Sequence, residues 1–221
     1  MPVGTICHFV TRYALRRVKE FISYRSRGKY IAIDYKWKGR FEMGEFYTMK
    51  IAGLERQLPI CPLNDKVSIA GFIVFGDVEL TVKACEELLK KIPEFDYIVT
   101  PEAKSIPLAY EMSRQSGKKY FVARKKAKLY MQNPVTVDVR SITTDAEQVL
   151  ILDGADGEQI KGKKVVIIDD VISTGESLAA MEKLMAHFDA QVVAKAAVLA
   201  EGDAAKRDDI VFLEELPLIF T

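Results

Sequence analysis

The 221-residue sequence is poor in cysteine, and the few that it has are poorly spaced for a metal site or a disulfide framework. Cys7, Cys61 and Cys85 are odd in number and widely separated. Structural zinc sites and disulfide frameworks use closely spaced or evenly paired cysteines. Neither is therefore expected to hold the fold, and we interpret the three residues as buried thiols in a reducing cytosol.

Long hydrophobic runs are also lacking. No stretch approaches the ~18 apolar residues that a membrane-spanning helix needs. Near the N-terminus, basic residues interrupt any apolar core of the kind a secretory signal peptide requires: Arg12, Arg16, Arg17 and Lys19. We therefore expect a cytoplasmic protein with no membrane partner.

Charge is nearly balanced overall, at +1, but it is unevenly distributed along the chain. Residues 1–40 carry ten lysines and arginines and two acids, a net +8, so the rest carries −7. Such an asymmetry can mark a segment that binds nucleic acid, a membrane surface or a phosphate-rich ligand. A solvated helix face, or one docked on the acidic body, is the commoner explanation, and we favour it here.

The N-terminal part of the sequence differs in pattern from the rest. Residues 5–25 have apolar side chains at helical spacing and predict an amphipathic helix. Short β-type runs follow at 30–35, 46–52 and 56–61, separated by Lys-Gly and Ala-Gly steps that predict turns of antiparallel hairpins. We divide the chain into an N-terminal extension, residues 1–45, and a main domain, residues 46–221.

The main domain alternates helices and β-branched strands from residue 77 onward. Helices are predicted at 77–91, with Asp77 as the N-cap, and at 106–115 and 176–188. Strands are predicted at 97–100, 120–123, 165–168, 192–199 and 210–213, and a hairpin projects from 134–143 and 148–153. This alternation predicts an α/β fold with a central parallel sheet of about five strands, covered by helices on both faces.

The strongest local signal is Lys-Val-Val-Ile-Ile-Asp-Asp-Val-Ile-Ser-Thr-Gly-Glu-Ser, residues 164–177. A buried strand ends in two carboxylates, and a Thr-Gly loop then opens a helix. The loop and the helix N-terminus offer backbone N–H groups and a positive dipole end, which suit a phosphate. Asp169 and Asp170 would repel that phosphate unless hydroxyl donors lie between, as the vicinal hydroxyls of a ribose 5-phosphate would.

Other nucleotide sites that follow a strand need motifs that this chain lacks. Nucleotide hydrolases use Gly-x-x-x-x-Gly-Lys-Ser/Thr, and dinucleotide-binding folds use Gly-x-Gly-x-x-Gly. Neither occurs here. Residues 164–177 instead closely resemble the motif of type I phosphoribosyltransferases that binds 5-phosphoribosyl-1-pyrophosphate (PRPP). The resemblance implies that Asp169 and Asp170 bind the ribose hydroxyls and that the 5′-phosphate is held by Ser173, Thr174, Gly175, Glu176 and Ser177.

Two further stretches resemble the same enzymes. Residues 99–109 are similar to the loop that holds the pyrophosphate of PRPP in adenine and xanthine phosphoribosyltransferases, with Lys104 as its cation and Ser105 where the family usually has glycine. Residues 122–131 are similar to the basic stretch before the mobile hood. That likeness implies that Arg124, Lys125 and Lys128 meet the departing pyrophosphate.

The resemblance also implies a reaction, a cofactor and a partner. It implies Mg²⁺-dependent transfer of phosphoribosyl from PRPP to a purine base, with the metal bound mainly through PRPP and no protein metal ligand assigned, in a homodimer. Arg140 stands in the hood where the relatives have an aromatic residue. Adenine is the first choice of base, and xanthine or another 6-oxopurine is the alternative.

A PRPP-sensing regulator of purine metabolism without catalysis is the competing class of function. Such regulators resemble this chain around residues 102–110 and carry a DNA-binding winged helix before the domain. Residues 1–70 offer one predicted helix and then hairpins, with no recognition-helix pair. We therefore do not expect nucleic acid as a partner, and we rank the enzyme first.

Overall fold

The computed structural model describes residues 22–26, 29–33, 45–139 and 148–220, and the chain divides into two compact units, Met1–Met43 and Gly44–Thr221. In the first unit, β1 (Ile22–Ser26) and β2 (Lys29–Ile33) form an antiparallel hairpin. The predicted helix over 5–25 is therefore wrong at its C-terminal end. There Ile22 and Tyr24 alternate with polar residues and pair with a β-branched strand, which favours sheet. The rest of that prediction lies outside the described residues.

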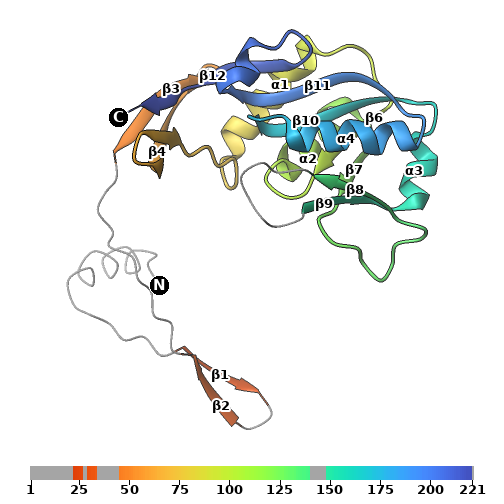
Figure 1. Ribbon diagram of the computed structural model, residues 1–221, viewed down its shortest axis with the longest axis horizontal. Coiled ribbons are helices and arrows are strands. Elements are labelled where there is room, and N and C mark those ends of the chain that lie inside the picture. Colours follow the sequence, from red (N-terminus) through yellow and green to blue (C-terminus); the bar gives the residue numbers. More distant parts are fainter. Residues whose placement is uncertain (1–21, 27–28, 34–44, 140–147, 221) are drawn as a thin grey trace, which may run out of the picture. The chain divides into compact units, whose positions relative to one another are not determined.

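The second unit is built on a five-stranded parallel sheet in the order β12-β11-β10-β6-β7 (Figure 1). Its strands are β6 (Tyr97–Pro101), β7 (Tyr120–Ala123), β10 (Lys164–Ile172), β11 (Gln191–Glu201) and β12 (Val211–Leu216). The chain runs outward from β6 to β7 and then returns to β10 on the other side of β6. The strand order thus reverses between β6 and β10, and such a switch point is where open α/β sheets bind ligands.

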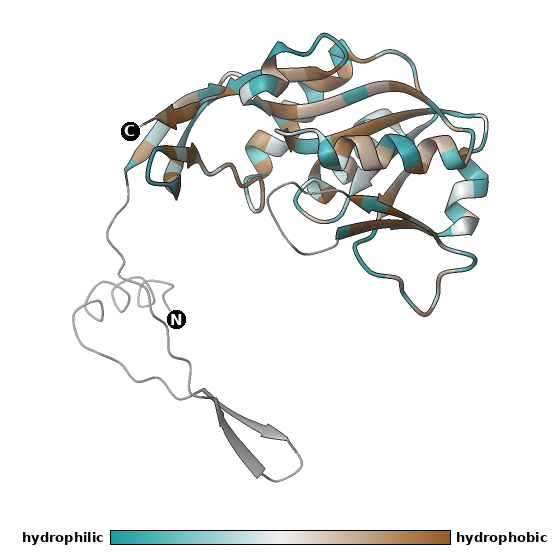
Figure 2. Cartoon of the chain, viewed as in Figure 1, coloured by the Kyte–Doolittle hydropathy of each residue, from teal (hydrophilic) through white to brown (hydrophobic). Residues whose placement is uncertain are grey.

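Helices cover both faces of this sheet, as expected. The strands are mostly hydrophobic along their length, whereas the helices alternate polar and apolar residues (Figure 2). Val166 and Ile168 of β10 pack in the core beneath α1 (Val78–Lys91) and α2 (Ile106–Ser116). Val165 and Ile167 pack in a second core with α3 (Gly154–Ile160) and α4 (Glu176–His187). The period of two along a strand buried on both faces explains this division.

The predicted hairpin is present in β8 (Val135–Val139) and β9 (Gln148–Leu152), which pair antiparallel. Arg124 and Ile151 exchange two backbone hydrogen bonds of 2.7 Å, which join the end of β7 to the hairpin. Residues 140–147, including Arg140, lie outside the described part. The sequence did not predict α3, a short helix whose N-cap Asp153 accepts a hydrogen bond from Ala155 N.

A second, antiparallel sheet has the order β13-β5-β4-β3. Its strands are β3 (Phe46–Ile51), β4 (Leu54–Asn64), β5 (Val67–Ala70) and β13 (Leu218–Phe220). The sequence predicted the first two strands but not β5 or β13. Cys85 is buried, as expected, but Cys61 is exposed because its strand has one solvent-facing side, so the interpretation as a buried thiol is wrong there.

Candidate active site

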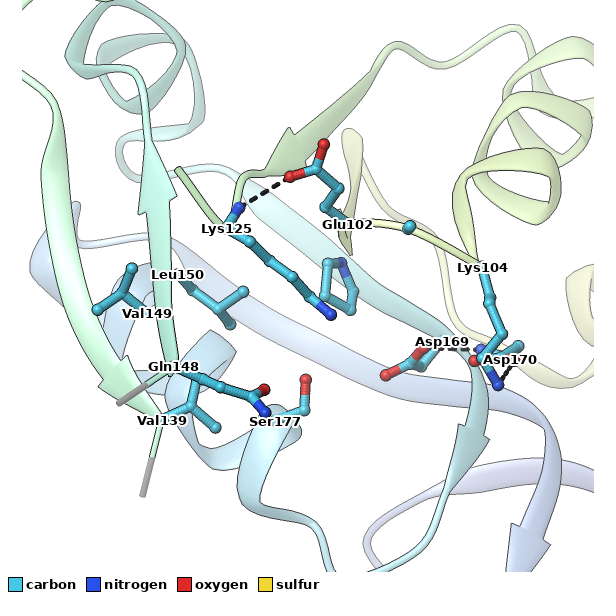
Figure 3. Close-up of a pocket in the computed structure, with 12 residues that line it drawn as sticks. Glu102, Lys104, Lys125, Val139, Gln148, Val149, Leu150, Asp169, Asp170 and Ser177 are labelled. Atoms are coloured by element: carbon cyan, nitrogen blue, oxygen red, sulfur yellow. Dashed lines mark hydrogen bonds and ion pairs between the residues drawn. The ribbon is translucent and has the colours of Figure 1, made fainter. Parts of the chain in front are cut away.

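A cavity of about 250 Å³ lies at the carboxyl ends of β6 and β10, at the point where the strand order reverses. The turn after β6 supplies one wall, β10 the floor, and the β8–β9 hairpin the opposite wall (Figure 3). The lining residues are Pro101, Glu102, Ala103, Lys104, Lys125, Val139, Gln148, Val149, Leu150, Asp169, Asp170 and Ser177. Segments distant in sequence thus meet around one cavity.

Asp169 and Asp170 come from the last third of β10. Successive residues of a strand point to opposite faces, so the two carboxylates differ in surroundings. The Asp170 side chain is 7% exposed, and its Oδ2 lies 2.7 Å from Lys104 Nζ. Asp169 is partly exposed, and its Oδ1 accepts a 2.9 Å hydrogen bond from the backbone N–H of Asp170. The ion pair with Lys104 offsets the buried charge of Asp170.

The pKa of Asp169 is raised to about 7, first because the carboxyl group is desolvated and then because Asp170 is beside it. Two adjacent carboxyl groups ionise together only at a cost, so the charge of Asp170 favours the protonated form of Asp169. Asp169 is therefore held as a carboxyl group that gains or loses a proton near neutral pH. A ligand that donates hydroxyl hydrogens would favour the ionised form.

Buried hydroxyl groups stabilise the turn between β6 and α2 through hydrogen bonds. The Thr100 hydroxyl lies 2.9 Å from the Ile168 carbonyl oxygen and 2.8 Å from the Ser105 hydroxyl, which donates to the Pro101 carbonyl at 3.0 Å. Ser105 is 1% exposed. Its side chain therefore supports the turn from below rather than lining the cavity. The Glu102–Ala103 peptide bond in this turn is cis.

Glu102 connects this turn to the basic stretch after β7. Its Oε2 accepts a 2.9 Å hydrogen bond from Lys125 N, and its Oε1 lies 3.1 Å from Arg124 Nη2. The Lys125 backbone hydrogen bond is the main reason that the pKa of Glu102 is lowered. Lys125 then points its side chain into the cavity (Figure 3). Arg124 is turned toward Glu102, and exposed Lys128 does not line the cavity.

A second cavity of about 130 Å³ adjoins the first at the loop between β10 and α4. Gly175, the N-cap of α4, has a φ of +80°, a left-handed conformation that glycine adopts without strain. The first N–H groups of a helix have no acceptor within it, so the start of α4 beside this cavity offers hydrogen-bond donors to an anion. The lining residues are Asp169, Val171, Ile172, Ser173, Thr174, Gly175, Ser177 and Leu178. Glu176 lies in the first turn of α4 and lines neither cavity.

Most of the predicted site residues line one of these two cavities, and the others do not. Lys104, Lys125 and the two aspartates share the larger cavity, and the loop residues except Glu176 share the smaller. Ser105, Arg124 and Lys128 do not line either cavity. Sequence reasoning missed Glu102 and Gln148, both in the larger cavity. Glu102 precedes the recognised lysine in its turn and could have been noticed, whereas Gln148 carried no signal.

Carboxylates near the cavity bear on metal binding. In the part of the chain that the structure describes, no group of three or more His, Cys, Asp or Glu side chains is placed to hold a metal ion. Magnesium commonly binds through one or two carboxylates together with phosphates of a substrate. Asp169 lines both cavities and Asp170 lines the larger one, so the two carboxylates fit that manner of binding. In the same described residues, no helix is long and apolar enough to cross a membrane.

Known proteins share both the sequence pattern and the fold. The chain is 32% identical over 135 residues to a hypoxanthine/guanine phosphoribosyltransferase of Methanothermobacter thermautotrophicus, covering 61% of this chain and 66% of that protein. It is 30% identical over 126 residues to an adenine phosphoribosyltransferase of Nocardia farcinica, covering 57% and 64%. The chain thus spans slightly less than two thirds of each of these relatives.

Solved structures of low sequence identity share the architecture. An adenine phosphoribosyltransferase from Thermoanaerobacter pseudethanolicus superposes with a TM-score of 0.60 at 20% identity, covering 72% of this chain and 95% of the other. The phosphoribosyl transferase domain matches residues 76–217, which contain the whole parallel sheet and both cavities. The type I phosphoribosyltransferase fold predicted from the sequence is confirmed, and the chain belongs to the phosphoribosyl transferase domain family.

Proposed function

We propose that this protein transfers the phosphoribosyl group of PRPP to a ring nitrogen of a purine base and releases pyrophosphate, within a domain spanning residues 46–221. The observation that carries the proposal is the meeting of Lys104, Asp169, Asp170 and the loop at Gly175 at the switch point of the sheet. Two hydroxyl acceptors, a cation and a phosphate-binding loop are the groups that PRPP requires.

Each group would have a role in stabilising charge around C1 of the ribose. Asp169 and Asp170 accept hydrogen bonds from the ribose hydroxyls and favour the positive charge that develops on the ring. Lys104 and Lys125 stabilise the departing pyrophosphate, joined by Lys128 when the basic stretch closes over it. Arg124 and Ser105 position these cations through Glu102 and the turn after β6.

The smaller cavity would hold the 5′-phosphate. Hydroxyl groups and backbone N–H groups are the donors there, and Glu176 contributes only its backbone. The residues concerned are Ser173, Thr174, Gly175, Glu176 and Ser177. The β8–β9 hairpin would exclude water, because water at C1 would hydrolyse PRPP in place of the transfer.

Mg²⁺ is part of the proposal, as a cation bound mainly through PRPP. When bound, it would neutralise pyrophosphate charge and so make it a better leaving group. Asp169 and Asp170 are the residues that would face it, directly or through water. Lys104 is paired with Asp170 at 2.7 Å and would have to turn from the carboxylate to the pyrophosphate.

Adenine is our first choice of acceptor, and hypoxanthine, guanine or xanthine the second. Relatives named for adenine and for hypoxanthine/guanine match at similar identity, so the experiment has to compare both kinds of base. The test is a panel of purine bases with PRPP and Mg²⁺, following pyrophosphate release. Turnover with adenine supports the first choice, and turnover with a 6-oxopurine alone supports the second. PRPP binding without turnover on any base would contradict transfer and favour the sensor.

We propose further that the protein is a cytoplasmic homodimer. A groove between α1 and α2 has an apolar lining, and large hydrophobic side chains near it are exposed, among them Val78 (72%) and Tyr110 (58%). A second copy covering this groove would bury them. Light scattering of the wild-type protein and of a Tyr110→Glu variant tests this. A monomeric wild type would contradict it.

A further inference from the structure

Arg207 lies against the loop that forms the smaller cavity, although it is distant from that loop in sequence. It follows a short 3-10 helix, η1 (Gly202–Lys206), at the end of β11. A Cβ atom built on Gly175 would lie 2.8 Å from Arg207 Nη1. Gly175 therefore has two reasons to be glycine: its φ of +80° and the guanidinium beside it.

The guanidinium is held in one orientation by its other edge. Arg207 Nε and Nη2 bond the two carboxylate oxygens of Asp209 at 2.8 and 2.7 Å. Asp209 also pairs with Lys195, which in turn lies 2.9 Å from Glu182 of α4. A bidentate arginine–carboxylate pair fixes geometry as well as charge. The Nη1 edge is therefore presented to Gly175 in advance of any ligand.

The charges around the smaller cavity make a cation there significant. Among the described residues that line it, none is a lysine or an arginine, and one is Asp169. A phosphate dianion in that cavity would meet hydroxyl and N–H donors and a nearby carboxylate. Neutral donors alone compensate two negative charges poorly in a partly desolvated site.

We propose that Arg207 is a further binding residue for the 5′-phosphate, acting from behind Gly175 and positioned by Asp209. The proposal deepens the proposed function and rests on it. It also gives a role to the ion-pair cluster formed by Arg207, Asp209, Lys195 and Glu182. These ion pairs are partly exposed, so they are expected to contribute little to stability.

The test measures binding of two fragments of PRPP separately, by calorimetry: ribose 5-phosphate and inorganic pyrophosphate. Arg207→Gln removes the cation. Lys206→Gln is the matched control, because it removes a neighbouring positive charge whose side chain is 80% exposed. We expect Arg207→Gln to weaken ribose 5-phosphate binding about tenfold and to leave pyrophosphate binding within about twofold, with no change for Lys206→Gln.

A second variant, Asp209→Asn, keeps the cation and loosens its orientation, and it should weaken ribose 5-phosphate binding by a smaller factor. Unchanged binding of ribose 5-phosphate by Arg207→Gln would overturn the proposal for Arg207 alone. Equal weakening of both fragments would also overturn it, since that result indicates general damage to the fold. A wild-type protein that binds neither fragment would contradict the proposed function itself.

Discussion

Replacing Asp169 by asparagine should stabilise the fold at neutral and alkaline pH while it removes ligand binding. The pKa of Asp169 is raised from 3.8 to about 7, by desolvation first and by Asp170 second. A folded-state pKa above the unfolded value means that the folded protein prefers the protonated group. The stability so gained is complete below pH 3.8 and is lost as the pH rises to about 7. Asparagine resembles the protonated acid in shape and cannot ionise.

The magnitude follows from the shift. About 3 pK units at 1.36 kcal/mol each give an upper limit of about 4 kcal/mol for the stability that the wild type loses across this range. Solvent at the partly exposed Asp169 reduces this figure, so we expect about 2 kcal/mol. At pH 8, the free energy of unfolding of the asparagine variant should therefore exceed that of the wild type by about 2 kcal/mol.

Urea unfolding at pH 5, 6, 7 and 8 is the assay, and Asp208→Asn is its control, because Asp208 is exposed and lines neither cavity. The difference between Asp169→Asn and wild type should grow with pH, whereas Asp208→Asn should follow the wild type. Parallel curves for Asp169→Asn and wild type would refute the reasoning. PRPP binding should be lost in the same variant, and the retained stability rules out unfolding as the cause.

Three other substitutions have expected outcomes. Gly157→Ala would place a Cβ 2.0 Å from the Phe188 ring, and we expect about 1–3 kcal/mol less stability, measured by urea unfolding; an unchanged midpoint would mean that the ring moves aside without cost. Lys104→Met removes the cation that pairs with buried Asp170. Because the Lys104 side chain is half-exposed, we expect a loss of only about 1 kcal/mol of stability, together with a rise of more than tenfold in the Kd for pyrophosphate. Unaltered pyrophosphate binding would show that Lys104 is not part of the site. Glu102→Gln should raise the KM for PRPP several-fold with stability unchanged, because the ionised carboxylate fastens the basic stretch, and an equal KM would contradict that role.

Local chemistry explains why the parallel sheet and the centre of the site could be predicted from the sequence. The strand β10 contains four consecutive β-branched residues before its two aspartates, α1 starts at an aspartate whose side chain accepts a hydrogen bond from Leu80 N, and Gly175 stands where the chain turns into α4. Each signal is contained within a few residues. The site then follows from topology, because strand ends of a parallel sheet lie at one edge.

Elements formed by long-range pairing were not predictable in the same way. β13 has three residues and exists because it pairs with β5, some 150 positions earlier in the chain. Its alternation is too short to predict a strand. Ser105 shows the same limit within the site. The sequence suggested its backbone N–H group as a pyrophosphate donor but gave no sign that its side chain is a buried support, bonded to the Thr100 hydroxyl and the Pro101 carbonyl.

The two cavities differ in where their charge comes from, and this difference explains what motifs could and could not reveal. The larger cavity carries its cations, Lys104 and Lys125, on turns that directly follow strands, so the cations are adjacent in sequence to recognisable elements. The smaller cavity is lined by a contiguous segment that contains a carboxylate and no cation. Its proposed positive partner, Arg207, follows η1 and is therefore distant in sequence from the segment that it lies against. A motif restricted to residues 164–177 therefore describes the donors for a phosphate but omits the charge that balances it.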